Sequence, residues 1–520
     1  MEFLEHTIDK LKGKKILVVS FTAMTPHLET SLEVSRRLYK SNSVEYVHLG
    51  RYVTRPTMYS KLFLKRKIQM PIRVKRVKNY LKKYSNLHSN IKWIDTAQFT
   101  GFNKSLNSDY SFNSLEELKS IEFKNYNIGV GVASTIVSDL ADPNPFPLDY
   151  KVSIEIKEQI KSAQISVNLA ESILNDNHFD AIVLFNGRMT CEHAVKQVAR
   201  SKGIKIYFHE RIKTNTRFFF EDYQPHIFDN RKKEMKYMKE EIPAEAINRI
   251  GEDFFKRKVI GDGVFEMSYT KNQISHTSTK LKEILDLNNG KRIISYFTNS
   301  DDEYQSIDGF SSRYPFFGDQ KSAVKEIADL AFSLNYFLIV RVHPNLKSKS
   351  SREISRWSEL SKYIQDRGFF WVGEDDPEST YDIIKKSSIV ISAGSTVGAE
   401  AAFLQKKSVV ITNSFYNGII PSVVLAESKE DLKKCLLGVD NNEIIDPKDS
   451  YIYGAWVLTY GAQYQYFAPL HEYSALYGLM KDGTRIANPG FFQWSIEVVK
   501  YFLGIGFKDF DNIFDKKISF

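Results

Sequence analysis

Short apolar runs rich in β-branched residues recur along the chain, and each ends at a polar or glycine-rich turn. Such runs are typical of strands buried on both faces of a parallel sheet, and the segments between them have the spacing of helices. The first group of runs is 15–21, 44–49, 91–94, 181–185 and 204–208, and the second is 292–297, 337–342, 369–373, 388–392 and 408–412. We therefore predict an α/β fold with two Rossmann-like sheets.

The last part of the second group is a strand, a turn at Gly394, a helix from Ser395 to about Gln405, and another strand. In open α/β sheets, ligands bind at the carboxyl edge, where this turn lies. Glycine allows a tight reversal, and hydroxyls at Ser395 and Thr396 stand where a helix begins, beside unpaired amides that favour a phosphate. Glu400, one turn further on, has the spacing to reach a ribose hydroxyl. The alternative is an ordinary helix cap with a solvated Glu400.

Two other strands of this group end in polar residues that we expect at the same edge. The strand 337–342 contains Arg341 and stops at His343-Pro344, and the strand 292–297 is followed by Thr298, Asn299 and Ser300. The next acids, 301–303, match either a divalent-metal site or a helix cap. We favour the cap and expect no metal and no cofactor. In the loop after 408–412, Tyr416 either stacks on a base or sugar or is an aromatic at the solvent edge.

The carboxyl edge of the first sheet also carries candidate chemistry. His27 and Glu29 follow its first strand, and Glu210 follows the run 204–208, so these three are candidates for a general base. Arg188 could bind an anionic group by a bidentate pair. Asn186, Arg211 and Tyr416 complete the polar residues that we expect in a cleft. The competing interpretation is structural: a helix cap, a packed histidine, and an Arg–Glu pair that joins two loops.

Composition narrows the class of protein. The chain has 520 residues, enough for two domains, and two distant cysteines, which give neither a disulfide framework nor a zinc spacing. No apolar run reaches the length of a membrane helix, and the first residues lack the apolar core of a signal peptide, so we expect a cytoplasmic protein. The formal charge is +9, with a basic concentration in 61–92. It predicts a solvated surface or contact with anionic lipid or a polyanionic acceptor, and no nucleic-acid motif accompanies it.

The motifs RVHPN and GSTVGAEAAFLQKKSVV, with FTNSDDEYQ and FNGRMTCEHAV, resemble GT-B glycosyltransferases that build bacterial surface polysaccharides, in particular capsule polysaccharide biosynthesis proteins. The resemblance implies two lobes facing a central cleft, with a C-terminal helix that crosses back. It also implies that a His-Pro motif and a Ser/Thr-rich turn hold the nucleotide of a sugar donor. The partners that it implies are a nucleotide-sugar and a glycan or lipid-linked glycan acceptor. The basic concentration in 61–92 adds an anionic membrane surface, at the inner face, as a further candidate partner.

We accordingly predict an acceptor-binding lobe (1–235), a helical connector (236–289), a nucleotide-sugar-binding lobe (290–480) and a C-terminal amphipathic helix (481–520). The predicted function is transfer of a sugar from a nucleotide-activated donor to a growing cell-surface glycan. The alternatives are a nucleotide-sugar 2-epimerase, a polyol-phosphate transferase of the same fold, and a donor-binding scaffold without activity. The sequence leaves open the donor, the acceptor and whether the anomeric configuration is inverted or retained.

Overall fold

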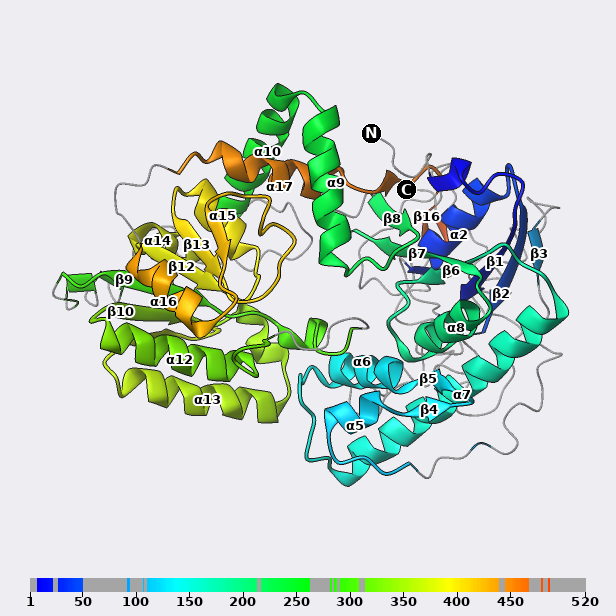
Figure 1. Ribbon diagram of the computed structural model, residues 1–520, viewed down its shortest axis with the longest axis horizontal. Coiled ribbons are helices and arrows are strands. Elements are labelled where there is room, and N and C mark those ends of the chain that lie inside the picture. Colours follow the sequence, from blue (N-terminus) through cyan, green and yellow to red (C-terminus); the bar gives the residue numbers. More distant parts are fainter. Residues whose placement is uncertain are drawn as a thin grey trace. The chain divides into compact units, whose positions relative to one another are not determined.

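The computed structural model describes residues 7–21, 27–49, 91–93, 106, 110–212, 217–261, 281–282, 285–286, 288, 290–307, 314–438, 445–466, 478–479 and 485–486. The chain forms two compact units (Figure 1). The first comprises 1–139, 145–225 and 460–520, and the second comprises 140–144 and 226–459. Each unit contains its own sheet, so the prediction of an α/β fold with two Rossmann-like sheets is confirmed.

The first unit is built on a seven-stranded sheet of order β15-β8-β7-β6-β1-β2-β3. The strands from β7 to β3 pair in parallel, whereas β8 pairs antiparallel with both β7 and β15. Their bounds are β1 Lys15–Ser20, β2 Ser43–His48, β3 Ile91–Trp93, β6 Ala181–Phe185, β7 Lys205–Arg211, β8 Arg217–Glu221 and β15 Ala462–Gln463. The sequence pattern missed β8, although three consecutive phenylalanines occupy its centre.

Helices cover both faces of this sheet. On one face, Leu28 and Leu32 of α2 pack with Ile16 and Val18 of β1. On the other, α8 contacts β6 and β7 and packs along α7. The helices of this unit are α2 His27–Leu38, α5 Leu115–Lys119, α6 Gly129–Leu140, α7 Tyr150–Asp176 and α8 Thr190–Ser201, and the short strand pairs are β4 Glu122–Phe123 with β5 Tyr126–Asn127 and β16 Gly478–Leu479 with β17 Arg485–Ile486.

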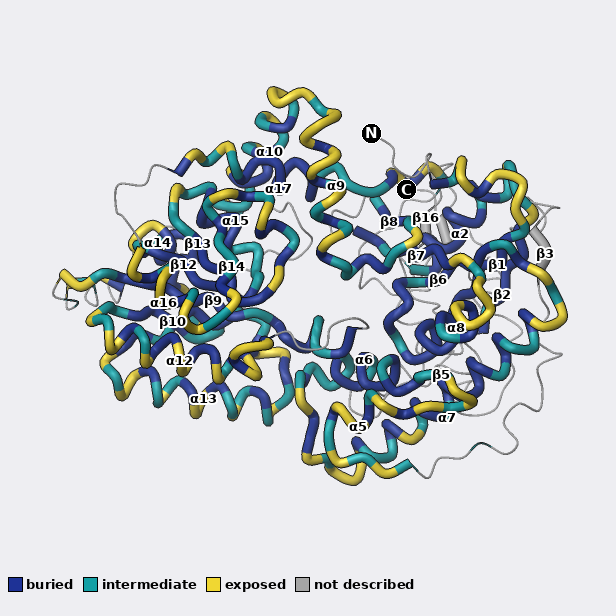
Figure 2. Tube along the Cα trace, viewed as in Figure 1, coloured by how far each residue is buried: buried dark blue, intermediate teal, exposed yellow. Residues whose placement is uncertain are grey.

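The second unit contains a six-stranded sheet of order β11-β10-β9-β12-β13-β14, in which every pair is parallel. The strands are β9 Ile293–Phe297, β10 Phe337–Arg341, β11 Phe370–Val372, β12 Ile389–Ser392, β13 Lys407–Val410 and β14 Val423–Leu425. They are almost wholly buried, as Figure 2 shows by their dark colour. Burial on both faces explains why the sequence shows continuous apolar runs here and not an alternation.

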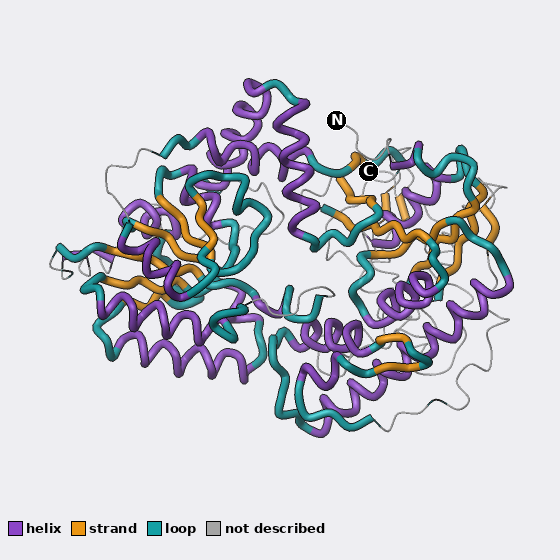
Figure 3. The backbone as a smooth tube through the Cα atoms, in the orientation of Figure 1, coloured by secondary structure: helices purple, strands orange, loops and turns teal. Residues whose placement is uncertain are grey.

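Two layers of helices enclose this sheet (Figure 3). On one face, α12, α13 and α16 bury Val324, Leu360 and Leu432 against the strands. On the other, α14 and α15 bury Ile384 and Ala401. The helices of the unit are α9 Phe228–Glu241, α10 Ala244–Val259, α12 Gln320–Ser333, α13 Ser351–Gln365, α14 Thr380–Lys386, α15 Val397–Phe403, α16 Lys429–Leu437 and α17 Lys448–Thr459, with the 3-10 turns η2 Asp301–Glu303 and η3 Pro344–Ser348.

Up to residue 261, the charged segment expected as a connector (236–289) forms the end of α9 and all of α10, which belong to the second unit. Helix α10 packs closely on α17 at Gly251, which has no side chain. A Cβ there would lie only 2.1 Å from the carbonyl oxygen of Tyr451. Within the described part of the chain, no helix is both long enough and apolar enough to cross a membrane. The basic positions from 61 to 90 and most of the predicted C-terminal helix (481–520) lie outside the described residues, and the described residues 485–486 of that range form the strand β17 and not a helix.

Candidate functional site

The strand order of the second sheet defines one edge position where a ligand is expected. From β9 the chain proceeds outward through β10 and β11, then returns to place β12 on the other side of β9. Ligands of doubly wound sheets bind where the order reverses in this way, beyond the carboxyl ends of the two central strands. Here those ends are Phe297 and Ser392, which are paired in the β9–β12 register. We call the loops that follow them, 298–300 and 393–396, the switch-point loops.

Asn299 ties the two switch-point loops together. Its Nδ2 donates a hydrogen bond to the carbonyl oxygen of Ala393 at 3.1 Å. Its backbone is held in turn by Gln320 of α12, which accepts from the Asn299 amide at 2.7 Å and donates to its carbonyl at 3.0 Å. The amide of Ser300 donates to Asn299 Oδ1 at 2.9 Å. This loop is therefore fixed before any ligand binds.

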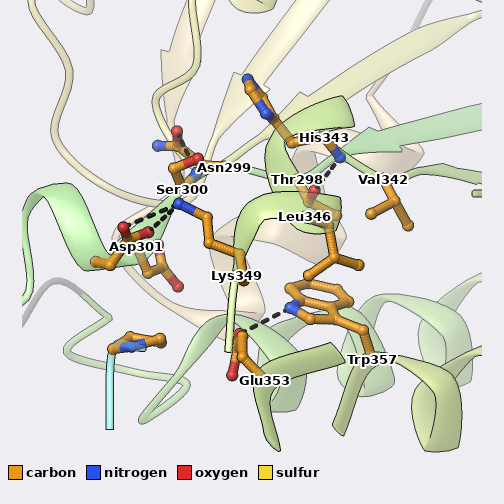
Figure 4. A pocket seen from close by; sticks show the side chains of 12 residues that line it. Thr298, Asn299, Ser300, Asp301, Val342, His343, Leu346, Lys349, Glu353 and Trp357 are labelled. Carbon is orange, nitrogen blue, oxygen red and sulfur yellow. Dashed lines mark hydrogen bonds and ion pairs between the residues drawn. The ribbon is translucent and has the colours of Figure 1, made fainter. Parts of the chain in front are cut away.

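His343 joins the same site from the end of β10. Its backbone amide donates to Thr298 Oγ1 at 2.8 Å, and its Nδ1 accepts from the amide of Asn345 at 3.1 Å. Because Nδ1 is an acceptor, the neutral ring carries its proton on Nε2 and presents a donor there. The ring points away from the side chain of Lys349 (Figure 4). The predicted meeting of Thr298 and His343 at one edge is thus present in the structure.

Gly394 makes the tight reversal that the sequence predicts, with a φ of 77°. A Cβ there would lie 3.0 Å from the carbonyl oxygen of Asn413 and 3.1 Å from Thr412 Oγ1. Within the described chain, no acceptor is paired with the backbone amides of Ser395 and Thr396. Helix α15 begins only at Val397 and has seven residues, so the predicted helix start at Ser395 is wrong and the helix dipole is small. The unpaired amides, not the dipole, are the feature that can bind a phosphate.

Two predicted donor-site residues, Arg341 and Glu400, have other contacts. The Arg341 guanidinium donates to the carbonyl oxygens of Gly373 and Asp376 at 2.9 and 3.1 Å, and burial lowers its pKa to about 10. It therefore shapes the loop after β11. Glu400 is buried, and its Oε1 accepts from Thr396 Oγ1 at 2.9 Å and lies 3.2 Å from Lys258 Nζ.

Tyr416 is neither open for stacking on a base or sugar nor at the solvent edge. It is 1% exposed, its ring meets Tyr453 edge-on at 5.4 Å, and its hydroxyl donates to the carbonyl oxygen of Ser395. Burial raises the pKa of this hydroxyl. Both predicted positions of Tyr416 are therefore corrected: it supports the Ser395 turn from inside.

A pocket opens beside the loop 298–300 (Figure 4). Its lining residues, besides Thr298, Asn299, Ser300 and His343, are Pro143, Asp301, Asp302, Val342, Leu346, Lys349, Glu353 and Trp357. Lys349 Nζ lies 2.7 and 2.9 Å from the two carboxylate oxygens of Asp302, and Tyr314 donates to Asp301 at 2.6 Å. The expected helix cap at these acids is wrong, because partners in the fold occupy both carboxylates. No cluster of metal-ligating side chains occurs among the described residues.

The first sheet has an equivalent position between β1 and β6, where its strand order reverses. The ring of His27, at the start of α2, lies 4.3 Å from that of Phe185 at the end of β6. Asn186 follows, and its Nδ2 donates to Glu210 Oε1 at 3.4 Å. The fold therefore brings His27, Asn186 and Glu210 to one edge, as the sequence predicts.

The other predicted residues of this edge differ in how far a ligand could reach them. Glu29 is 0% exposed within α2. Arg188 donates from Nε and Nη2 to the hydroxyls of Ser134 and Ser138 at 2.9 and 2.6 Å. Arg211 is buried near His27, whose pKa it helps to lower. Glu210 is the half-buried carboxylate among the three candidate bases.

Three histidines lie at or near this edge and are neutral at pH 7. Burial lowers the pKa of His27 to about 4, with a smaller contribution from Arg211. Burial also lowers the pKa of His48, at the end of β2, to about 4 and that of His209 in β7 to about 3. A neutral imidazole can accept a proton, but a pKa of about 4 makes His27 a weak base near pH 7. His209 directly precedes Glu210 at the end of a predicted strand, so the sequence places it near this edge, whereas no motif marks His48.

Glu192 in the first turn of α8 is a further titratable group near this edge. Burial raises the pKa of its carboxyl from 4.5 to about 7, and among the described residues no cation lies within ion-pair distance. Between these two pH values the folded chain holds a proton that the unfolded chain releases. The contribution of Glu192 to stability is therefore present below pH 4.5 and is lost as the pH rises to 7.

Replacing Glu192 with glutamine should remove this pH dependence. From about pH 5 to about pH 8, the unfolding free energy of Glu192→Gln should rise relative to wild type by about 2–3 kcal/mol. Urea denaturation at several pH values measures the difference in unfolding free energy between the variant and wild type. The buried histidines are present in both proteins, so their contribution cancels and the difference reports on Glu192. Glu116→Gln, at a side chain 73% exposed in the same unit, is the matched control and should give no such trend. Parallel pH curves for wild type and Glu192→Gln would contradict the prediction.

No protein-family model and no curated protein matches the chain. Among solved structures, a β-Kdo 2,7 transferase, KpsC from Thermosulfurimonas dismutans, is 12% identical, with 65% of this chain and 89% of that chain covered and a TM-score of 0.32. A UDP-GlcNAc 2-epimerase from Methanocaldococcus jannaschii, in complex with UDP-GlcNAc and UDP, is 12% identical, with 86% and 99% covered and a TM-score of 0.26. These TM-scores lie below 0.5, so neither likeness supports a function for this chain.

Proposed function

We propose that this chain is a glycosyltransferase that moves a sugar from a nucleotide-activated donor to a cell-surface glycan. The observation that carries the proposal is the pair of switch-point loops of the second sheet. There the Asn299–Ala393 hydrogen bond joins the two loops, and the second loop contains the unpaired amides of Ser395 and Thr396. Preorganised donors of this kind stabilise the charge that develops on a departing nucleoside phosphate.

The chemistry of transfer assigns a role to each side chain. The amides of Ser395 and Thr396, with Nε2–H of His343, would hold the phosphate of the donor. Because these backbone and imidazole N–H groups can hydrogen-bond a phosphate directly, we propose that transfer requires no metal ion. The acceptor hydroxyl must lose a proton as it attacks the sugar, and a base within hydrogen-bond reach accelerates this step. We assign that base to Glu210 at the carboxyl edge of the first sheet, with Asn186 orienting its carboxylate at 3.4 Å.

The test is turnover of the purified chain with sugars of CMP, UDP, GDP and dTDP, in EDTA, with and without a glycan acceptor. Release of nucleotide that depends on the acceptor supports the proposal. His343→Ala should lower this release by about a hundredfold, the usual cost of losing one donor to a developing anion. Glu210→Gln should also lower it, while leaving nucleotide affinity unchanged.

The competing functions give different outcomes in the same assay. An epimerase would convert the sugar of the donor without any acceptor. A polyol-phosphate transferase would release CMP and form a phosphodiester. A scaffold would bind a nucleotide without turnover. Full activity of His343→Ala would contradict the role proposed for that side chain.

A further inference from the structure

The side chain of Lys232 in α9 lies beside the switch-point loops, although its sequence context contains no binding motif. Its Nζ donates to Asn413 Oδ1 at 2.6 Å, in the loop that follows β13. Helix α9 is anchored in this place by Phe228, whose ring meets Phe415 edge-on at 4.6 Å and lies 5.9 Å from Tyr304. Phe415 follows β13 and Tyr304 follows η2, so α9 packs on loops at the carboxyl edge of the sheet.

Asn413 links Lys232 to the glycine turn. Its carbonyl oxygen lies 3.0 Å from where a Cβ of Gly394 would stand, while its side chain accepts the hydrogen bond from Lys232. Asn413 Oδ1 also accepts from the amide of Ser414 at 3.1 Å, which fixes the direction of the side chain. The ammonium group is therefore separated from the Gly394 turn by a single residue.

The charge of Lys232 is poorly compensated in this position. The side chain is only 16% exposed, and the carboxylate of Asp229, its partner, is 4.0 Å away and 75% exposed. Burial lowers the pKa of Lys232, Lys236 lowers it further, and Asp229 offsets part of this effect. A partly desolvated ammonium with a neutral amide as its close partner gains most from a bound anion.

We propose that Lys232 is a further binding residue for the donor, pairing with the phosphate that the Ser395 and Thr396 amides hold. The inference rests on the proposed function, because it requires a nucleotide at the switch-point loops. It adds a cation to a site whose other donors are neutral. Lysine binds phosphate as a point charge, so the contribution depends on charge more than on the shape of the side chain.

The experiment compares nucleotides with nucleosides on the full chain. Calorimetric titrations compare CMP, UDP, GDP and dTDP each with its own nucleoside. They use wild type, Lys232→Met, Lys232→Arg and Lys233→Met. Lys233 is an exposed neighbour on the same helix and serves as the matched control. Lys232→Met should weaken binding of the nucleotide roughly tenfold to a hundredfold and leave binding of the nucleoside unchanged. Lys232→Arg should retain most of the affinity, and Lys233→Met all of it.

The outcomes separate this inference from the proposed function. Suppose that wild type prefers the nucleotide over the nucleoside and Lys232→Met keeps that preference in full. The role of Lys232 is then overturned, while the donor site stands. If wild type prefers none of CMP, UDP, GDP and dTDP over the matching nucleoside, the donor site and the role of Lys232 both fail. An unchanged melting temperature of Lys232→Met establishes that lost binding does not come from unfolding.

Discussion

Replacing Gly394 with alanine should abolish nucleotide binding, with a loss of affinity of at least about a hundredfold. The residue has a φ of 77°, which costs a non-glycine residue about 1–2 kcal/mol. The new Cβ would also lie 3.0 Å from the Asn413 carbonyl oxygen and 3.1 Å from Thr412 Oγ1, so the turn must shift. A shift of this turn moves the amides of Ser395 and Thr396, which follow it directly. Titration with UDP and CMP measures the loss, and thermal denaturation measures the strain.

Gly368 provides a matched control for the strain alone. It has a φ of 74° in the same unit, and a Cβ there would meet nothing within 4 Å. It precedes β11 and therefore lies at the amino edge of the sheet, away from the switch-point loops. Gly368→Ala should destabilise the chain by a similar backbone cost while leaving nucleotide binding intact. Equal binding by Gly394→Ala and Gly368→Ala would refute the role of the glycine turn.

Replacing Lys349 with methionine should produce the largest loss of stability. Lys349 and Asp302 are 9% and 7% exposed and form a close ion pair in the wall of the pocket. Burial already raises the pKa of Asp302 even with Lys349 in place. Removing the cation leaves a buried carboxylate without its partner, which typically costs about 3–5 kcal/mol. Urea denaturation at neutral pH should show a loss of this size.

Two further variants test the cause of this loss. Lys349→Met combined with Asp302→Leu removes both charges, and most of the lost stability should return. Lys429→Met breaks an exposed ion pair with Glu326, whose side chains are 47% and 46% exposed, and should cost less than about 1 kcal/mol. If Lys349→Met cost no more than Lys429→Met, the pair would not be buried in solution as the structure has it.

The sequence predicts the two sheets well because their strands are buried on both faces. Every apolar run assigned to the second sheet is a strand in the structure, with ends that differ by one or two residues. Parallel strands place their carboxyl ends at one edge, so the meeting of Thr298, His343 and Gly394 also follows from the pattern. A short helix is harder, and α15 begins two residues later than expected because Thr396 and Ser395 belong to the turn.

Side-chain partners are harder to predict, because they come from distant parts of the fold. Nothing near Tyr416 in the sequence indicates that Ser395 and Tyr453 would surround it. Arg341 follows the same rule, since the carbonyls that it contacts belong to the loop after β11. The sequence does not distinguish Lys232 from the other lysines of its charged helix. Only the tertiary contact with Asn413 does so.

A crystal structure of the chain with its tightest-binding nucleotide tests the central claim most directly. A phosphate oxygen should lie within about 3.5 Å of the amide nitrogen of Ser395 or Thr396, with Nε2 of His343 as a second donor. A phosphate bound elsewhere, with the switch-point loops of the second sheet empty, would contradict the claim.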